Sequence, residues 1–171
     1  MRCGASGPEL LAARDRRQEL LERRAAEGWR PLIALSLAIP GAEKTPPGAA
    51  ALFAWAEREL SRALPGQRLL HRSEDALGPF AVFAAPGEPP AVKARCVALE
   101  EARPAARLLD LDVYAPGLVA VDRAALGLPP RACLCCGEPA RACIRAGRHP
   151  FAELAARARA LLQATGSASP R

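Results

Sequence analysis

Arg107-Leu108-Leu109-Asp110-Leu111-Asp112-Val113 is the stretch of this sequence that says most about its fold. Its leucines and valine predict a short buried strand, and because side chains alternate along a strand, Asp110 and Asp112 share one face. The rise per residue separates the two acids by about 6 to 7 Å along the backbone. Two oxygen donors on one rigid, apolar strand suit Mg²⁺ that is also bound by substrate phosphates. We therefore take Asp110 and Asp112 as candidate catalytic and magnesium-binding residues.

The acidic pair also has a plainer interpretation. An Asp-x-Asp pair on a strand is often two solvated carboxylates, and Arg107 next to it could neutralise one of them. The apolar run around the acids favours a cation, because an unpaired charge among apolar neighbours is costly.

Working outward, the strand expected over 107–115 turns at Pro116-Gly117 into a second short strand at 118–122. The apolar run at 31–40, bounded by prolines, predicts a central strand covered on both faces. Two further strands, 67–72 and 79–85, read as a hairpin. Apolar residues at helical spacing predict the remaining elements, which are helices at 7–26, with a break near 13–15, and at 48–64, 91–102 and 150–163. This order indicates an α+β fold with a small mixed sheet flanked by helices.

The length of 171 residues fits a single domain, which we place at 1–165, with a polar tail at 166–171 expected to be disordered. The net charge is +6, and all basic residues except Lys44 and Lys93 are arginines. A guanidinium binds phosphate through two parallel hydrogen bonds, so this surface favours a polyphosphate substrate or an acidic protein partner. Nucleic acid is the less favoured ligand, because no long basic run interleaved with aromatic residues is present.

No apolar segment has the length of a signal-peptide core or a membrane span, and the longest run is 32–39. We therefore expect a cytoplasmic protein without a membrane partner. Six cysteines in such a chain are better explained as thiols or metal ligands than as disulfides.

Four residues near the C-terminus form a pattern C-x2-C-x6-C-x5-H, and they are Cys133, Cys136, Cys143 and His149. Three thiolates and one imidazole can complete a tetrahedral Zn²⁺ site, and a site closed in this way is structural. Cys135 is then a spare thiol. The alternative is a set of reduced, partly buried thiols in a Cys/His-rich loop.

The chain resembles a known family, the holo-acyl-carrier-protein synthases of citrate lyase, also called apo-citrate lyase phosphoribosyl-dephospho-CoA transferases. The resemblance covers about residues 10 to 160. One departure is Arg103-Pro104-Ala105-Ala106, where the family usually has His-Pro-Leu-Gly. The matching motifs are RLLDLDV at 107–113, LPPRACLCC at 128–136 with Cys143 and His149 downstream, Arg14, Asp15, Arg17 and Gln18 near the N-terminus, and Pro40, Gly41 and Lys44 after the first strand.

This resemblance implies a nucleotidyltransferase-like fold and reaction. A serine of the citrate lyase acyl carrier subunit would attack the α-phosphorus of 2'-(5''-triphosphoribosyl)-3'-dephospho-CoA and release pyrophosphate. Mg²⁺ held by Asp110 and Asp112 would bind the triphosphate. The residues that would contact the triphosphate oxygens are Arg14, Arg17, Lys44 and Arg107.

Two other functions remain open from the sequence. One is the equivalent transferase for malonate decarboxylase, which acts on a different carrier. The other is a non-catalytic, zinc-stabilised binding module that uses its arginine-rich surface. The module would tolerate asparagine at Asp110 and Asp112, whereas the transferase would not.

Overall fold

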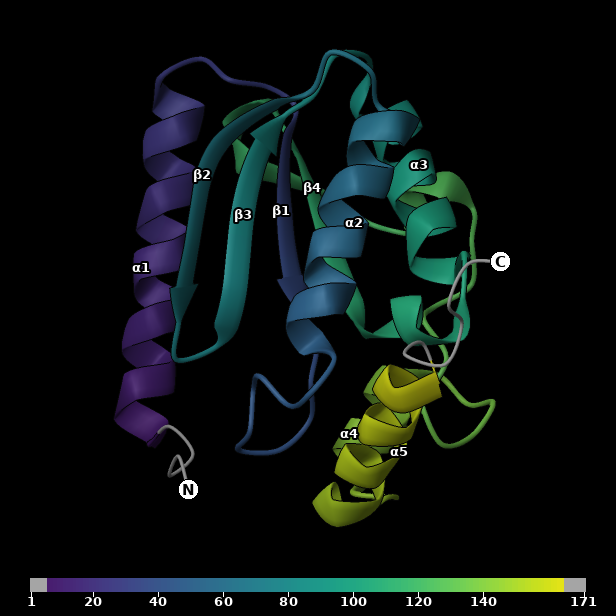
Figure 1. Cartoon of the computed structure of the whole chain (residues 1–171). Helices are drawn as coiled ribbons and strands as arrows, with labels where there is room; N and C mark the ends of the chain where they lie inside the picture. Colours follow the sequence, from purple (N-terminus) through teal and green to yellow (C-terminus); the bar gives the residue numbers. More distant parts are fainter. Residues whose placement is uncertain (1–5, 165–171) are drawn as a thin grey trace, which may run out of the picture.

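The computed structural model describes residues 6–164 and is organised around a five-stranded sheet (Figure 1). The strands are β1 (Leu32–Leu37), β2 (Arg68–Asp75), β3 (Gly78–Ala84), β4 (Leu109–Ala115) and β5 (Val119–Val121). Their order in the sheet is β2-β3-β1-β4-β5, and every neighbouring pair is antiparallel. The prediction of a mixed sheet is therefore wrong. β3 and β4 do run parallel to each other, as a strand-helix-strand crossover requires, but β1 lies between them and runs opposite to both.

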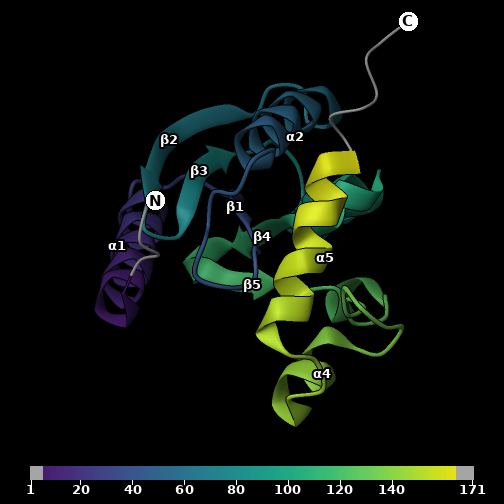
Figure 2. The same cartoon turned by 60° about the horizontal axis from the view of Figure 1, so that its bottom comes forward.

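Helices cover both faces of this sheet (Figure 2). Among the α-helices of residues 6–164, α1 (Gly7–Ala26) is the one on the first face. On the other face lie α2 (Ala49–Ala63), α3 (Pro89–Glu101) and α5 (Phe151–Ala164), with the short α4 (Ala140–Ala146) beside α5. Three 3-10 turns join the elements around β4 and β5, and they are η1 (Pro104–Leu108), η2 (Pro116–Leu118) and η3 (Ala124–Leu126). Within residues 6–164, no helix combines the length and apolar character needed to cross a membrane.

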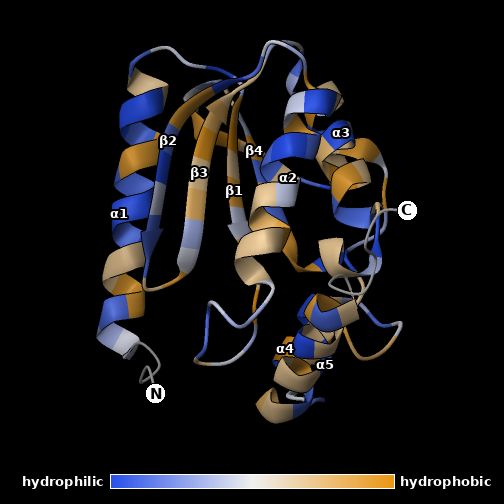
Figure 3. Ribbon diagram, in the orientation of Figure 1, coloured by the Kyte–Doolittle hydropathy of each residue, from blue (hydrophilic) through white to orange (hydrophobic). Residues whose placement is uncertain are grey.

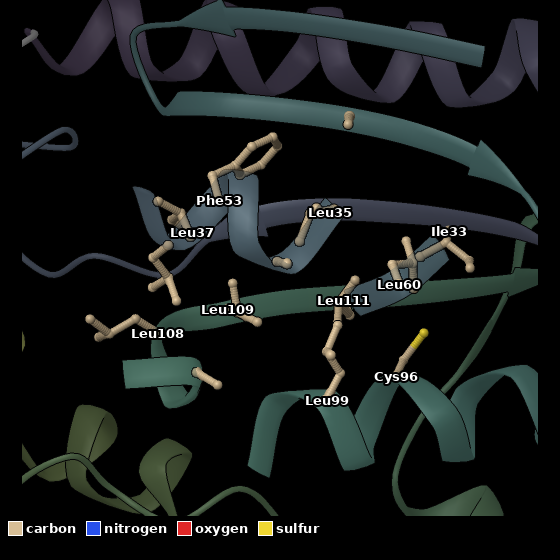
Figure 4. Packing of buried hydrophobic residues seen from close by; sticks show 14 of the residues in the cluster. Ile33, Leu35, Leu37, Phe53, Leu60, Cys96, Leu99, Leu108, Leu109 and Leu111 are labelled. Carbon is tan, nitrogen blue, oxygen red and sulfur yellow. The ribbon is translucent and has the colours of Figure 1, made fainter. Parts of the chain in front are cut away.

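The central strand β1 is buried on both faces, as its apolar sequence predicts. Ile33, Leu35 and Leu37 join the large core beneath α2 and α3, and Leu32 and Ala34 join a smaller core beneath α1. β4 is buried on one face, where Leu109, Leu111 and Val113 join the large core. Figure 4 shows Leu111 of β4 pointing toward Leu99 of α3.

α1 is a continuous helix, so the predicted break near 13–15 is wrong. Ala13 is fully buried within it, and the small side chain lets the helix approach its neighbours closely. Ser6 and Glu9 form a reciprocal capping box at its start. Figure 3 shows polar residues along much of α1, whereas β1 and β3 are mostly apolar.

The other predicted elements are present with shifted ends. β2 and β3 form the expected hairpin, but pairing continues to Asp75 and Gly78, so the turn is tighter than the sequence indicates. α4, which carries Cys143, was not predicted. The predicted tail at 166–171 lies outside the described residues.

Candidate functional site

Asp110 and Asp112 lie on β4, on the same side of the sheet as the smaller core beneath α1. The intervening Leu111 points into the opposite core, so the two carboxylates share one face, as predicted. Directly across from them on β1 stand Ser36, paired with Asp110, and Ala34, paired with Asp112. Because both neighbours are small, the carboxylates remain open on this face of the sheet.

Three charged side chains hold the backbone of β4 next to these acids. β5 pairs only with the C-terminal half of β4, at Val113 to Ala115. Along the N-terminal half of β4, Lys93 Nζ donates to the Leu111 carbonyl oxygen at 2.8 Å, and the Leu111 N–H donates to Glu100 Oε1 at 2.9 Å. These side chains thus take the place of a neighbouring strand.

Arg131 joins this group from the LPPR motif. Its guanidinium donates to the Leu109 carbonyl oxygen at 2.9 Å and pairs with Glu100 at 2.7 Å. The same Nη2 lies 3.8 Å from Asp110 Oδ1. Lys93 and Glu100 are both buried, so this charge arrangement is fixed by the core. These charged groups hold the backbone at Leu109 and at Leu111, the residues on either side of Asp110.

The electrostatics of the pair favour a bound cation. The Asp112 side chain reaches solvent, but protein atoms crowd it, and this partial desolvation together with the charge of Asp110 raises the pKa of Asp112 to about 6. Lys93 opposes the increase. A divalent cation between the carboxylates would relieve their repulsion, so the residues present fit Mg²⁺ by charge and donor type.

The Arg17 side chain and the Lys44 backbone both lie beside the tip of the β2–β3 hairpin. Arg17 donates to both carboxylate oxygens of Asp75, at 2.8 and 2.7 Å, and to the Gly78 carbonyl oxygen at 2.8 Å. Gly78 has a φ of 93°, and a Cβ there would lie 3.2 Å from the Lys44 carbonyl oxygen. Lys44 Nζ donates to the Ile39 carbonyl oxygen at 2.9 Å.

The remaining two predicted substrate-binding residues lie apart from each other. Arg14 is exposed on α1, one turn before Arg17, and makes no hydrogen bond or ion pair within residues 6–164. Arg107 lies on η1 and donates to the carbonyl oxygens of Ala132 and Cys133, at 3.3 and 2.7 Å. Arg107 therefore contacts the cysteine-rich segment.

The predicted Cys/His cluster is assembled in space. The ligand atoms of its four residues all lie within 4.8 Å of one another, and these residues are Cys133, Cys136, Cys143 and His149. Cys136 Sγ lies 3.4 Å from Cys143 Sγ and 3.3 Å from His149 Nε2. The hydrogen bond with His149 is the main reason that the pKa of Cys136 is lowered to about 6, which makes a thiolate available to a cation.

The surroundings of this cluster resemble those of a metal centre. His149 Nδ1 lies 3.3 Å from Glu153 Oε1, so a carboxylate orients the ring whose other nitrogen faces the thiols. Cys135, His149 and Glu153 form a second group of possible ligands. That group shares the imidazole of His149, whose Nε2 faces Cys136, and the role of Cys135 as a spare thiol stays a prediction.

Sequence reasoning missed three residues beside the acidic pair. Ser36 is the only polar residue in the apolar run at 32–39, and this interruption is a usable signal. Lys93 and Glu100 are seven residues apart, so they share a helix face with the apolar residues of α3. The sequence pattern could have indicated that these two charged residues lie at core positions. It could not have indicated that they bind the backbone of Leu111 on β4.

Comparisons with known proteins show the family to which the chain is similar. The family model for apo-citrate lyase phosphoribosyl-dephospho-CoA transferase matches residues 6–165. Proteins of that name from Escherichia coli O139:H28 and Escherichia coli O8 are 31% identical to this chain over 160 residues, covering 91% of this chain and 87% of theirs. A relative from Shigella boydii serotype 18 matches to the same extent. The chain therefore belongs to the apo-citrate lyase phosphoribosyl-dephospho-CoA transferase family.

Proposed function

We propose that this protein transfers the phosphoribosyl-dephospho-CoA group to a serine of the apo-citrate lyase acyl carrier subunit. The observation that carries the proposal, beside family membership, is the open pair of carboxylates Asp110 and Asp112 on β4. The donor is 2'-(5''-triphosphoribosyl)-3'-dephospho-CoA. A fold of the nucleotidyltransferase type is the finer assignment that this reaction implies.

The reaction is a displacement at the α-phosphorus of the donor. The serine oxygen forms a bond to that phosphorus, the bond to the outer two phosphates breaks, and pyrophosphate leaves while the serine proton passes to a base or to water. Such reactions depend on positioning and on neutralising phosphate charge. The protein supplies both through rigid carboxylates and surrounding cations.

Asp110 and Asp112 would hold Mg²⁺, with Ser36 facing Asp110 across the strand pair. When bound, the ion neutralises the triphosphate and stabilises charge that develops on its oxygens. Lys93 and Glu100 bind the backbone of Leu111 and so keep β4, which holds both acids, fixed while the substrate binds. The two carboxylates therefore need no rearrangement to offer their oxygens.

Cationic residues would bind the anionic donor and the carrier. Arg14 is exposed and can turn toward phosphate, Arg17 lies at the hairpin tip, and the Lys44 backbone lies beside that tip. Arg107 contributes on the side of the cysteine-rich segment. The net charge of +6 favours an acidic carrier domain.

Zinc in the Cys/His cluster would be structural. Cys133, Cys136, Cys143 and His149 would supply all four ligands of a structural zinc and leave none for substrate. The segment that carries them accepts hydrogen bonds from Arg107 through its backbone carbonyls. Metal analysis of protein purified without a histidine tag tests this assignment. Protein that folds and contains no stoichiometric zinc would remove it.

The function is tested by the intact mass of purified apo acyl carrier subunit after incubation with this protein, Mg²⁺ and the triphosphoribosyl donor. The expected result is an increase equal to the phosphoribosyl-dephospho-CoA group, absent with EDTA and with Asp110→Asn. Glu19→Gln, an exposed carboxylate-to-amide change on α1, serves as the matched control and should retain activity.

Two other outcomes would redirect the proposal. Modification of the malonate decarboxylase carrier alone would assign the enzyme to that system. Modification of neither carrier, with Asp110→Asn behaving as wild type in carrier binding, would favour the non-catalytic binding module.

A further inference from the structure

A cavity of about 930 Å³ lies between the C-terminal end of α3, η1 and the cysteine-rich segment. We call it the arginine pocket, because five arginines line it: Arg103, Arg107, Arg123, Arg131 and Arg157. Its size is that of a site for a small organic molecule. Pro104, Pro129, Pro130 and Leu134 add apolar surface to its wall.

The charge of the arginine pocket is strongly positive. Five arginines face only two carboxylates, Glu100 and Glu101, a net charge of +3. Glu100 is buried and paired with Arg131, and Glu101 is paired with Arg123 at 2.7 Å. Both acids are therefore already neutralised, and a concave wall of one sign concentrates anions.

Two of the arginines have unused hydrogen-bonding capacity. The Arg103 guanidinium stacks 3.7 Å from the centre of the Trp55 ring, and its buried Nε has no hydrogen-bond acceptor among the described residues. The terminal nitrogens of Arg103 likewise make no hydrogen bond or ion pair within residues 6–164, so they are the atoms that a ligand in the pocket can contact. Arg157 is exposed on α5 and makes no hydrogen bond or ion pair within residues 6–164.

The arginine pocket adjoins the acidic pair but is distinct from it. Arg131 is the shared wall, because it lines the pocket and its Nη2 lies 3.8 Å from Asp110 Oδ1. Asp110 and Asp112 themselves do not line the pocket. A ligand longer than one phosphate group could therefore place one anionic part at the acids and another in the pocket.

We infer that the arginine pocket binds the dephospho-CoA portion of the donor, with Arg103 and Arg157 contacting its diphosphate. This inference rests on the proposed function. The triphosphate belongs with Mg²⁺ at the carboxylates, whereas the pocket offers guanidinium groups, which bind phosphate esters without a metal. Its apolar wall and its volume, larger than a diphosphate needs, suit the organic groups attached on either side.

The test is calorimetric binding of dephospho-CoA to the full-length protein in EDTA. We expect binding to wild type, and binding at least about tenfold weaker in Arg103→Gln and in Arg157→Gln, from the usual strength of charge-assisted hydrogen bonds. Asp110→Asn should bind as wild type does. Arg95→Gln, an exposed change on α3 outside the pocket, is the matched control.

Other outcomes would overturn the inference. These are no binding to folded wild-type protein, binding that requires Mg²⁺ or Asp110, and arginine variants that weaken inorganic triphosphate or carrier binding but leave dephospho-CoA unchanged. Because Arg157 is exposed, its variant remains informative if Arg103→Gln unfolds. If the wild-type protein binds dephospho-CoA without metal but transfers nothing to the acyl carrier subunit, the result counts against the proposed function and not against this pocket.

Discussion

Lys93 Nζ lies 2.8 Å from the carbonyl oxygen of Leu111, the residue between Asp110 and Asp112. A buried lysine thus fixes the strand that presents both acids. Lys93→Met should lower the free energy of unfolding by about 1.5 to 3 kcal/mol, the usual value for a hydrogen bond to a charged group. Denaturant unfolding measures this change.

The same variant should also require more Mg²⁺ for half-maximal transfer, because the acids lose their fixed spacing. A titration of rate against Mg²⁺ measures this effect. Arg95→Met, two residues along α3 and exposed, is the control. An unchanged Mg²⁺ requirement in a destabilised Lys93→Met would show that Lys93 serves stability alone.

Asp112→Asn should abolish transfer yet make the metal-free protein more stable near neutral pH. The pKa of Asp112 is raised to about 6 from 3.8, so between these values the folded state binds more protons than the unfolded state. Stability contributed by the protonated form is therefore lost as pH rises through about 6. After allowing for solvent screening, we expect a gain of about 1 kcal/mol, or about 2 to 4 °C in Tm.

Thermal unfolding in EDTA over a pH series checks this prediction. The difference between Asp112→Asn and wild type should shrink toward zero below about pH 4, where the wild-type carboxyl is protonated in both states. A variant that is less stable than wild type at neutral pH would contradict the assigned desolvation of Asp112 and its repulsion by Asp110.

Ser36→Leu should fold but lose transfer activity. Leucine suits a buried strand, but at this position it would stand directly opposite Asp110 and crowd the carboxylate face. Ser36→Ala, which keeps the face open, should retain most activity. Circular dichroism and the carrier mass assay separate the two effects, and an active Ser36→Leu enzyme would show that substrate does not use this face.

Cys136→Ala should remove bound zinc and lower Tm, whereas Cys135→Ala should keep both. The two thiols are adjacent in sequence, but only Cys136 contacts both Cys143 and His149. Zinc content by mass spectrometry and thermal unfolding test the pair. Equal zinc loss in both variants would favour the group formed by Cys135, His149 and Glu153.

Local patterns accounted for much of this fold. Alternation placed Asp110 and Asp112 on one face, and the apolar run, interrupted only by Ser36, predicted β1 as a central strand buried on both sides. Helical spacing located α2, α3 and α5 to within a few residues. Each of these inferences depends on contacts within one segment and on which face is buried.

The sequence by itself determined the carboxylate pair with its strand, and the four-residue cysteine and histidine pattern, but not the short helix α4 that carries Cys143. Only the tertiary structure decided that β1 separates β3 from β4, that Lys93 and Glu100 bind the backbone of Leu111, and that Arg103 and Arg157 line one pocket. The reason is physical. Periodicity reports which side of an element is buried, whereas strand order and contacts between charged groups arise from packing between segments far apart in the chain.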